Sequence, residues 1–220
     1  MNYFNKRIKK VQFYARIAQI TPFLRAIILN SSMANGTANE KSDIDFLIIT
    51  SPNRLYTVRF FLNLLALLSG KKRKPFDLNP AGKFCLNYFI TSKNLILPRI
   101  KRNALYHRRS VNVWSVGEEF NDFIQANDWM EKYEREIVED KKQRKIIVES
   151  FPVKNIAMFK LWRKFVEFVL SKKFGDFAER KMFIWQSQRI LSSETYKITP
   201  RIRLKVSKNE LRLHPFKDIE

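Results

Sequence analysis

The chain has 220 residues, 45% hydrophobic and 14% aromatic, so it can bury a substantial core and is not a disordered tail. Its formal charge of +21 indicates a polyanionic partner, nucleotide or nucleic acid, or else a lysine-rich surface that only solvates the protein. Cys85 is the only cysteine, which excludes a disulfide framework and a thiolate metal site and favours a reducing compartment.

No targeting or membrane-spanning segment is evident. The basic start of the chain is followed by a mixed amphipathic stretch, without the apolar region and cleavage site of a signal peptide. The most apolar run, residues 60–68, lies between Arg59 and Lys71, which are too close together for a bilayer-spanning helix of about 20 residues. We therefore expect a cytoplasmic protein with a buried helix here and no membrane partner.

The first half of the chain alternates between predicted helices and strands. Apolar spacing predicts a helix over residues 5–20, which Pro22 ends, and a buried strand over 23–29. A loop rich in Ser, Asn and Gly follows over 30–41, and a second strand over 43–50. A helix over 54–69 then ends at Gly70.

A basic loop over 71–80 leads to a third predicted strand over 83–91, and a basic stretch follows over 99–109. A helix is predicted over 118–133, and the charged segment 134–144 is either a linker or the exposed end of that helix.

The remainder of the chain reads as mainly helical. A long amphipathic region over 156–191 is broken or bent at Gly175, and 202–213 alternate like a hairpin. Together the elements predict an α+β fold, a small mixed β-sheet flanked by helices with a C-terminal helical region. We place one domain at 1–133 and a mainly helical region, ending in the hairpin, at 134–220.

Two aspartates at the start of the second predicted strand are the strongest chemical signal. Side chains two apart on a strand point the same way, so Asp43 and Asp45 present two carboxylates on one face. The pair is either an exposed strand end or a site for a hard divalent cation with phosphate oxygens completing its shell.

The preceding loop favours the second alternative. Ser31 and Ser32 follow an apolar strand, and Gly36 comes four residues after Ser32. Backbone N–H groups and a hydroxyl at such a turn form an anion site. The spacing from Ser32 to Asp43 lets the loop fold back so that the phosphate and metal sites meet.

Other polar residues give weaker signals. On the helix over 54–69, Tyr56, Arg59 and Asn63 form one stripe that faces either water or a cleft, where Arg59 would neutralise phosphate charge. Arg54 is a second candidate for this role.

The basic segments 71–74 and 99–109 are either ordinary exposed loops or a track for a nucleic-acid backbone, with Tyr106 or Trp114 offering stacking faces. His107 and His214 show no metal-ligand spacing. Trp162 and Trp185 are most simply core residues.

Residues 31–50, SSMANGTANEKSDIDFLIIT, resemble the signature of the DNA polymerase beta-type nucleotidyltransferase superfamily. SPNRLYTVRFFLNLLALL, KFCLNYFI and NELRLHPF are similar to a bacterial subgroup of nucleotidyltransferase domain proteins. The resemblance implies Mg²⁺-dependent transfer of a nucleoside monophosphate from a nucleoside triphosphate to an acceptor hydroxyl. It also implies that Ser32 contacts the triphosphate and that Asp43 and Asp45 hold the metals.

The chain departs from this family at two positions. The family's glycine is Ser31 here, and serine adopts unusual φ angles less readily. The third carboxylate of the family corresponds best to Asn87, which cannot act as a general base and is equally well explained as a buried amide.

We therefore predict a Mg²⁺-dependent nucleotidyltransferase with an unidentified acceptor. The alternatives are a catalytically degenerate relative that binds nucleotide or RNA, and an antitoxin-like partner whose acidic segment 118–149 docks a basic protein.

Overall fold

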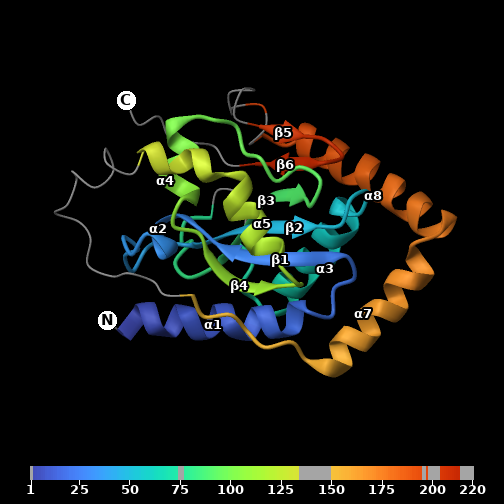
Figure 1. Cartoon of the computed structure of the whole chain (residues 1–220), viewed down its shortest axis with the longest axis horizontal. Helices are drawn as coiled ribbons and strands as arrows, with labels where there is room; N and C mark the ends of the chain where they lie inside the picture. Colours follow the sequence, from blue (N-terminus) through green and yellow to red (C-terminus); the bar gives the residue numbers. More distant parts are fainter. Residues whose placement is uncertain (1, 74–76, 134–149, 195–196, 198–203, 214–220) are drawn as a thin grey trace.

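A mixed six-stranded sheet forms the centre of the molecule (Figure 1). The computed structural model describes residues 2–73, 77–133, 150–194, 197 and 204–213. The strand order is β4-β1-β2-β3-β6-β5, with β2 and β3 parallel and the other neighbours antiparallel. The strands are β1 (Leu24–Leu29), β2 (Ile44–Thr50), β3 (Phe84–Thr91), β4 (Val111–Ser115), β5 (Lys205–Val206) and β6 (Glu210–Arg212).

Helices cover both faces of this sheet, so its central strands are apolar on both sides. Along β2, Phe46 and Ile48 join the larger core, under α1 (Asn2–Ala18) and α3 (Leu55–Leu68). Leu47 and Ile49 point the other way, into a smaller core. That second face is covered by α4 (Lys101–His107), α5 (Glu119–Ala126) and the 3₁₀ helix η1 (Asp128–Tyr133). This two-sided burial explains the continuous apolar run of β2.

Two further helices, α7 (Ala157–Leu170) and α8 (Lys173–Leu191), lie along one edge of the molecule (Figure 1). A buried carboxylate fixes α8 against the start of α3. Glu179 of α8 accepts hydrogen bonds from the backbone N–H groups of Tyr56 and Thr57 at 2.9 and 2.8 Å. These N–H groups have no partner within α3, so Glu179 caps α3 from another helix.

The α+β class, the mixed sheet and the C-terminal helices are confirmed. The predicted hairpin is also present, and β6 pairs with β3, so the end of the chain completes the central sheet. The domain boundary at 133/134 stays a prediction. The segment 134–144, Lys74 and His214 lie outside the described residues.

Several elements differ from the predictions. The basic stretch 99–109 contains α4, which buries Asn103, Ala104 and His107. The sequence did not predict this helix because charged residues surround these three positions in the chain. The five-residue strand β4 was too short to give a signal. The predicted helix 118–133 changes to η1 beyond Asn127, whose side chain receives the Leu97 N–H at 2.8 Å. The predicted loop contains one helical turn, α2 (Ser31–Ala34).

Gly175 does not interrupt the helical region as predicted. The break lies between α7 and α8, and Gly175 is buried inside the first turn of α8. A Cβ at this position would lie 1.7 Å from the Leu170 carbonyl oxygen. The glycine therefore lets α8 pack closely against the end of α7. None of the helices that the structure describes has the length and apolar character needed to cross a membrane.

Candidate active site

The two aspartates lie where three backbone segments converge. Asp43 precedes β2, and Asp45 is the second residue of that strand. The Asn30 N–H, directly after β1, donates to the Asp45 carbonyl at 3.1 Å. On the other side, Asp45 is in parallel register with Cys85 of β3. We call residues 30–38 the Ser/Gly loop. The fold therefore places the beginning of this loop beside the aspartates.

Burial and like charge dominate the electrostatics of the pair. Asp45 is 8% exposed, and ligand atoms of Asp43, Asp45 and Cys85 all lie within 4.8 Å of one another. Burial and the Asp45 carboxylate raise the pKa of Asp43, while Arg73, which donates to that carboxylate, opposes the rise. Burial, followed by the two carboxylates, raises the pKa of the Cys85 thiol, so Cys85 is a neutral neighbour.

The Ser/Gly loop keeps a glycine-like backbone at the position of the substituted serine. Ser31 has a φ of +59°, in the left-handed region that glycine adopts without steric cost, and Gly36 has a φ of +71°. The Ser32 carbonyl accepts the N–H groups of Thr37 and Ala38 at 2.9 and 3.0 Å, which folds the loop back on itself. Ser31 therefore strains the turn without removing it.

Two helices hold this loop from opposite sides. In α1, the Tyr3 hydroxyl and the Arg7 guanidinium donate to backbone carbonyls of residues 38–40. From the loop itself, the Asn35 side chain donates to the Leu105 carbonyl of α4 at 3.1 Å. A rigid support of this kind orders a binding loop before its ligand arrives.

Comparison with protein-family models matches residues 26–158 to the nucleotidyltransferase domain. The chain belongs to this family. The match covers more than half of the sequence and includes the loop, both aspartates and Cys85. No curated protein and no solved structure is significantly similar to the chain.

The residue that pairs in register with Asp45 on the next strand of the nucleotidyltransferase domain is Cys85, two residues before the predicted Asn87. The register changes between Cys85 and Tyr88, because β3 uses one more residue than β2 over this interval. The Asn87 Oδ1 atom is buried and has no hydrogen-bond partner among the described residues. Sequence reasoning missed Cys85 because it reads as an ordinary core residue, and only the parallel register identifies it.

The cation beside the aspartates is also different from the predicted ones. Arg54 follows the far end of β2, roughly 20 Å of strand away, and pairs with Asp176 of α8 at 2.7 Å. The Arg59 guanidinium donates to Gln186 of α8, and burial lowers its pKa to about 10. Arg73, from the basic loop after α3, pairs with Asp43 instead.

In the stripe of Tyr56, Arg59 and Asn63, the first two bond to other parts of the fold, and the half-buried Asn63 side chain donates to the Arg59 carbonyl of the same helix at 2.8 Å. Tyr56 is fully buried, and its hydroxyl donates to the Ser207 carbonyl at 3.0 Å. Trp114, predicted as a stacking face, is 1% exposed and donates to Asn155 at 3.0 Å, so it cannot stack on a base. Tyr56 and Trp114 therefore stabilise contacts between segments that are distant in the sequence.

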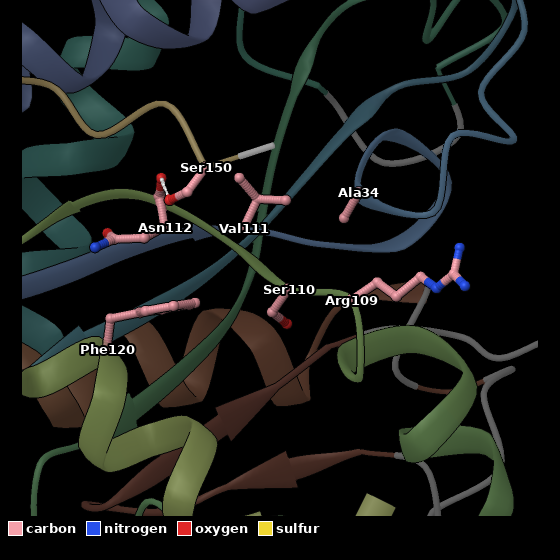
Figure 2. Close-up of a pocket in the computed structure, with 7 residues that line it drawn as sticks. All are labelled: Ala34, Arg109, Ser110, Val111, Asn112, Phe120 and Ser150. Atoms are coloured by element: carbon pink, nitrogen blue, oxygen red, sulfur yellow. Dashed lines mark hydrogen bonds between the residues drawn. The ribbon is translucent and has the colours of Figure 1, made fainter. Parts of the chain in front are cut away.

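A cavity of about 340 Å³ adjoins the Ser/Gly loop at Ala34. In Figure 2, Ala34 of α2 and Arg109 lie toward one end of it, and Phe120 of α5 lies toward the other. The cavity is lined by Ala34, Arg109, Ser110, Val111, Asn112, Phe120 and Ser150. It therefore offers both apolar and polar contacts to a group bound next to the loop.

Proposed function

We propose that this nucleotidyltransferase transfers a nucleoside monophosphate from a nucleoside triphosphate to an acceptor hydroxyl, with Mg²⁺ as its metal. The observation that carries the proposal is the pair of half-buried Asp43 and buried Asp45 at the beginning of β2, beside the Ser/Gly loop. This arrangement combines two carboxylates for a cation with a backbone turn for phosphates.

The donor set fits a hard divalent cation. Mg²⁺ is usually held by one or two carboxylates together with substrate phosphates, so Asp43 and Asp45 suffice without a third protein ligand. Arg73 supplies one positive charge to two carboxylates, which leaves a negative charge at the site. When bound, Mg²⁺ would neutralise charge on the triphosphate and on the departing pyrophosphate.

The chain's own residues would bind and orient the triphosphate. Ser32 and the backbone of the Ser/Gly loop would contact phosphate oxygens, and Gly36, with its positive φ, would permit their close approach. Arg73 would stay on the Asp43 carboxylate and hold it in position. These residues would contribute mainly positioning and charge stabilisation, which account for much of the rate enhancement in the enzymatic transfer of phosphoryl groups.

A second candidate function is nucleotide binding without transfer, and the neutral residue beside the aspartates favours it. The raised pKa of Cys85 keeps its thiol protonated, and Asn87 has no titratable group. Neither residue can remove a proton from an acceptor hydroxyl as a carboxylate would.

Label transfer separates the two functions. The purified chain is incubated with Mg²⁺, cell lysate and nucleoside triphosphates that carry radiolabel on either the α- or the γ-phosphate. Nucleotidyl transfer attaches the α-label, but not the γ-label, to an acceptor. The Asp43→Asn/Asp45→Asn variant should lose the signal, and Asp122→Asn, which changes an exposed acid on α5, should retain it.

Absence of α-label transfer by the unmodified chain, with nucleotide binding intact, would reject catalysis and leave the binding function. Transfer of the γ-label instead would contradict the proposed reaction.

A further inference from the structure

The outer face of α7 is apolar, although the helix lies at the edge of the molecule (Figure 1). Six of its large apolar side chains recur at helical spacing, but they point away from the core with exposed fractions of 47–69%. A stripe of this kind normally packs against the protein interior. The exposed residues are Met158, Leu161, Trp162, Phe165, Phe168 and Val169.

Further large apolar side chains are exposed on α8. Phe174 and Phe177 are 67% and 59% exposed, and Trp185 is 50% exposed. The two tryptophans expected in the core, Trp162 and Trp185, are therefore half-exposed, and that expectation is wrong. We call the exposed side chains of residues 157–191 the α7–α8 outer face. Apolar surface of this extent on a folded chain marks an interaction site.

All three acidic residues of α7 and α8 bond back to the body of the protein. Glu167 receives the Phe23 N–H at 2.6 Å and pairs with Arg25 at 3.1 Å. Asp176 is paired with Arg54, and Glu179 caps α3. The negative charges of these helices are thus used in holding them to the sheet domain.

The cations of the two helices are exposed instead, with the exception of Arg163. Two cations lie beside exposed rings, since the Nζ of Lys172, between the helices, is 5.2 Å from the Phe168 ring and the Nζ of Lys181 is 5.5 Å from the Phe177 ring. The others are Lys160, Lys164, Lys173, Arg180 and Arg189. The α7–α8 outer face therefore combines apolar side chains with positive charge.

We propose that the α7–α8 outer face binds the surface of a bilayer that contains anionic phospholipid. Its apolar side chains would enter the boundary between headgroups and acyl chains, and its lysines would contact the headgroups. The helices would lie in the interface rather than cross the bilayer, so the proposal departs from the expectation of no membrane partner. The proposal is independent of nucleotidyl transfer.

The composition of the face favours an anionic bilayer over two other occupants. A nucleic acid would satisfy the cations but would not bury aliphatic side chains such as Met158, Leu161 and Val169. A second copy in a twofold contact would bring identical rows of cations together, and like charges repel. An anionic bilayer complements the charge and buries the apolar surface.

Vesicle flotation with the full chain tests the proposal. At low ionic strength, the bound fraction should be at least tenfold higher with phosphatidylcholine–phosphatidylglycerol vesicles than with phosphatidylcholine alone, and added salt should reduce it. Phe165→Ser/Phe168→Ser and Lys160→Glu/Lys164→Glu should each reduce binding at least tenfold. The matched controls Ile96→Ser and Lys93→Glu, which change exposed residues of the loop after β3, should bind normally.

Tryptophan fluorescence gives a second readout that does not depend on flotation. Trp114 and Trp129 are buried, so a blue shift on adding anionic vesicles would report Trp162 and Trp185, and Trp162→Phe should diminish it. Unchanged thermal unfolding of each variant excludes misfolding.

Equal binding to both vesicle types, no binding to either, or full binding by the double variants would overturn the proposal. So would a stable dimer, seen by analytical ultracentrifugation without lipid, that the Phe165→Ser/Phe168→Ser variant dissociates, because that result assigns the face to a second copy.

Discussion

Replacement of Asp45 by asparagine should stabilise the metal-free protein, although the residue is buried. Ligand oxygens of Asp43 and Asp45 lie within 4.8 Å of each other. Two like charges at this separation repel by about 3 kcal/mol when the effective dielectric constant is about 20. Arg73 offsets part of that repulsion. We expect a net gain of about 1 kcal/mol, or roughly 2–4 °C in Tm for a chain of this size.

Thermal unfolding in chelator measures this gain in stability, and thermal unfolding in Mg²⁺ measures how much the metal stabilises each variant. A metal concentration ten times its Kd should stabilise the unmodified chain by about 1.4 kcal/mol, because only the folded state binds it. Asp45→Asn should begin with a higher Tm and gain little from metal, whereas Asp122→Asn should behave like the unmodified chain. A lower Tm of Asp45→Asn in chelator, or an unchanged response to metal, would refute the reasoning.

Three further substitutions test the loop, the helix packing and the third position. Ser31→Gly should raise the free energy of unfolding in urea by about 0.5–1 kcal/mol, because glycine adopts the left-handed φ without strain. The control Ser32→Gly should lower it. A lower free energy of unfolding for Ser31→Gly would show that Ser31 is not strained. Glu179→Ala should lower the free energy of unfolding by about 2–4 kcal/mol, because buried N–H groups of α3 lose their acceptor, and unchanged stability would show that water replaces it. Cys85→Asp should increase α-label transfer at least about tenfold. Asn87→Asp should not increase the transfer. If Asn87→Asp increased it and Cys85→Asp did not, Asn87 would occupy the position of the family's third carboxylate.

The strands that carry the site could be predicted because their signals are local. The apolar run of β2 begins directly after Asp43, and this order alone places a carboxylate pair at one end of a buried strand. The Ser/Gly loop was predictable from its composition, and the antiparallel pairing of β1 and β2 brings it to Asp45. The family resemblance of residues 31–50 depends on the same short segment.

The neighbours of the aspartates could not be predicted because they depend on long-range register. Cys85 lies beside Asp45 only through the parallel pairing of β2 and β3, and Arg73 reaches Asp43 only after α3 has returned along the sheet. Arg54 and Arg59 had suitable chemistry in the sequence, but both side chains bind residues of α8 instead, Asp176 and Gln186 respectively.

Helical periodicity likewise failed to say which way a helix faces. The amphipathic pattern of α7 predicted an apolar stripe correctly, yet this stripe points outward, because Arg163 and Glu167 bind the helix to the sheet domain. Arg163 and Glu167 on the inner face cannot be distinguished, from periodicity alone, from charged residues of a solvated face.

Metal-dependent binding of nucleoside triphosphate to the purified chain tests the central claim most directly. Each of the four common nucleoside triphosphates, as a nonhydrolysable analogue, is titrated by calorimetry with and without Mg²⁺. We predict saturable binding that requires Mg²⁺, is lost in Asp43→Asn/Asp45→Asn and is retained in Asp122→Asn. Absence of binding by every analogue, or binding that the double variant leaves unchanged, would contradict the assignment of the site to Ser31–Asp45.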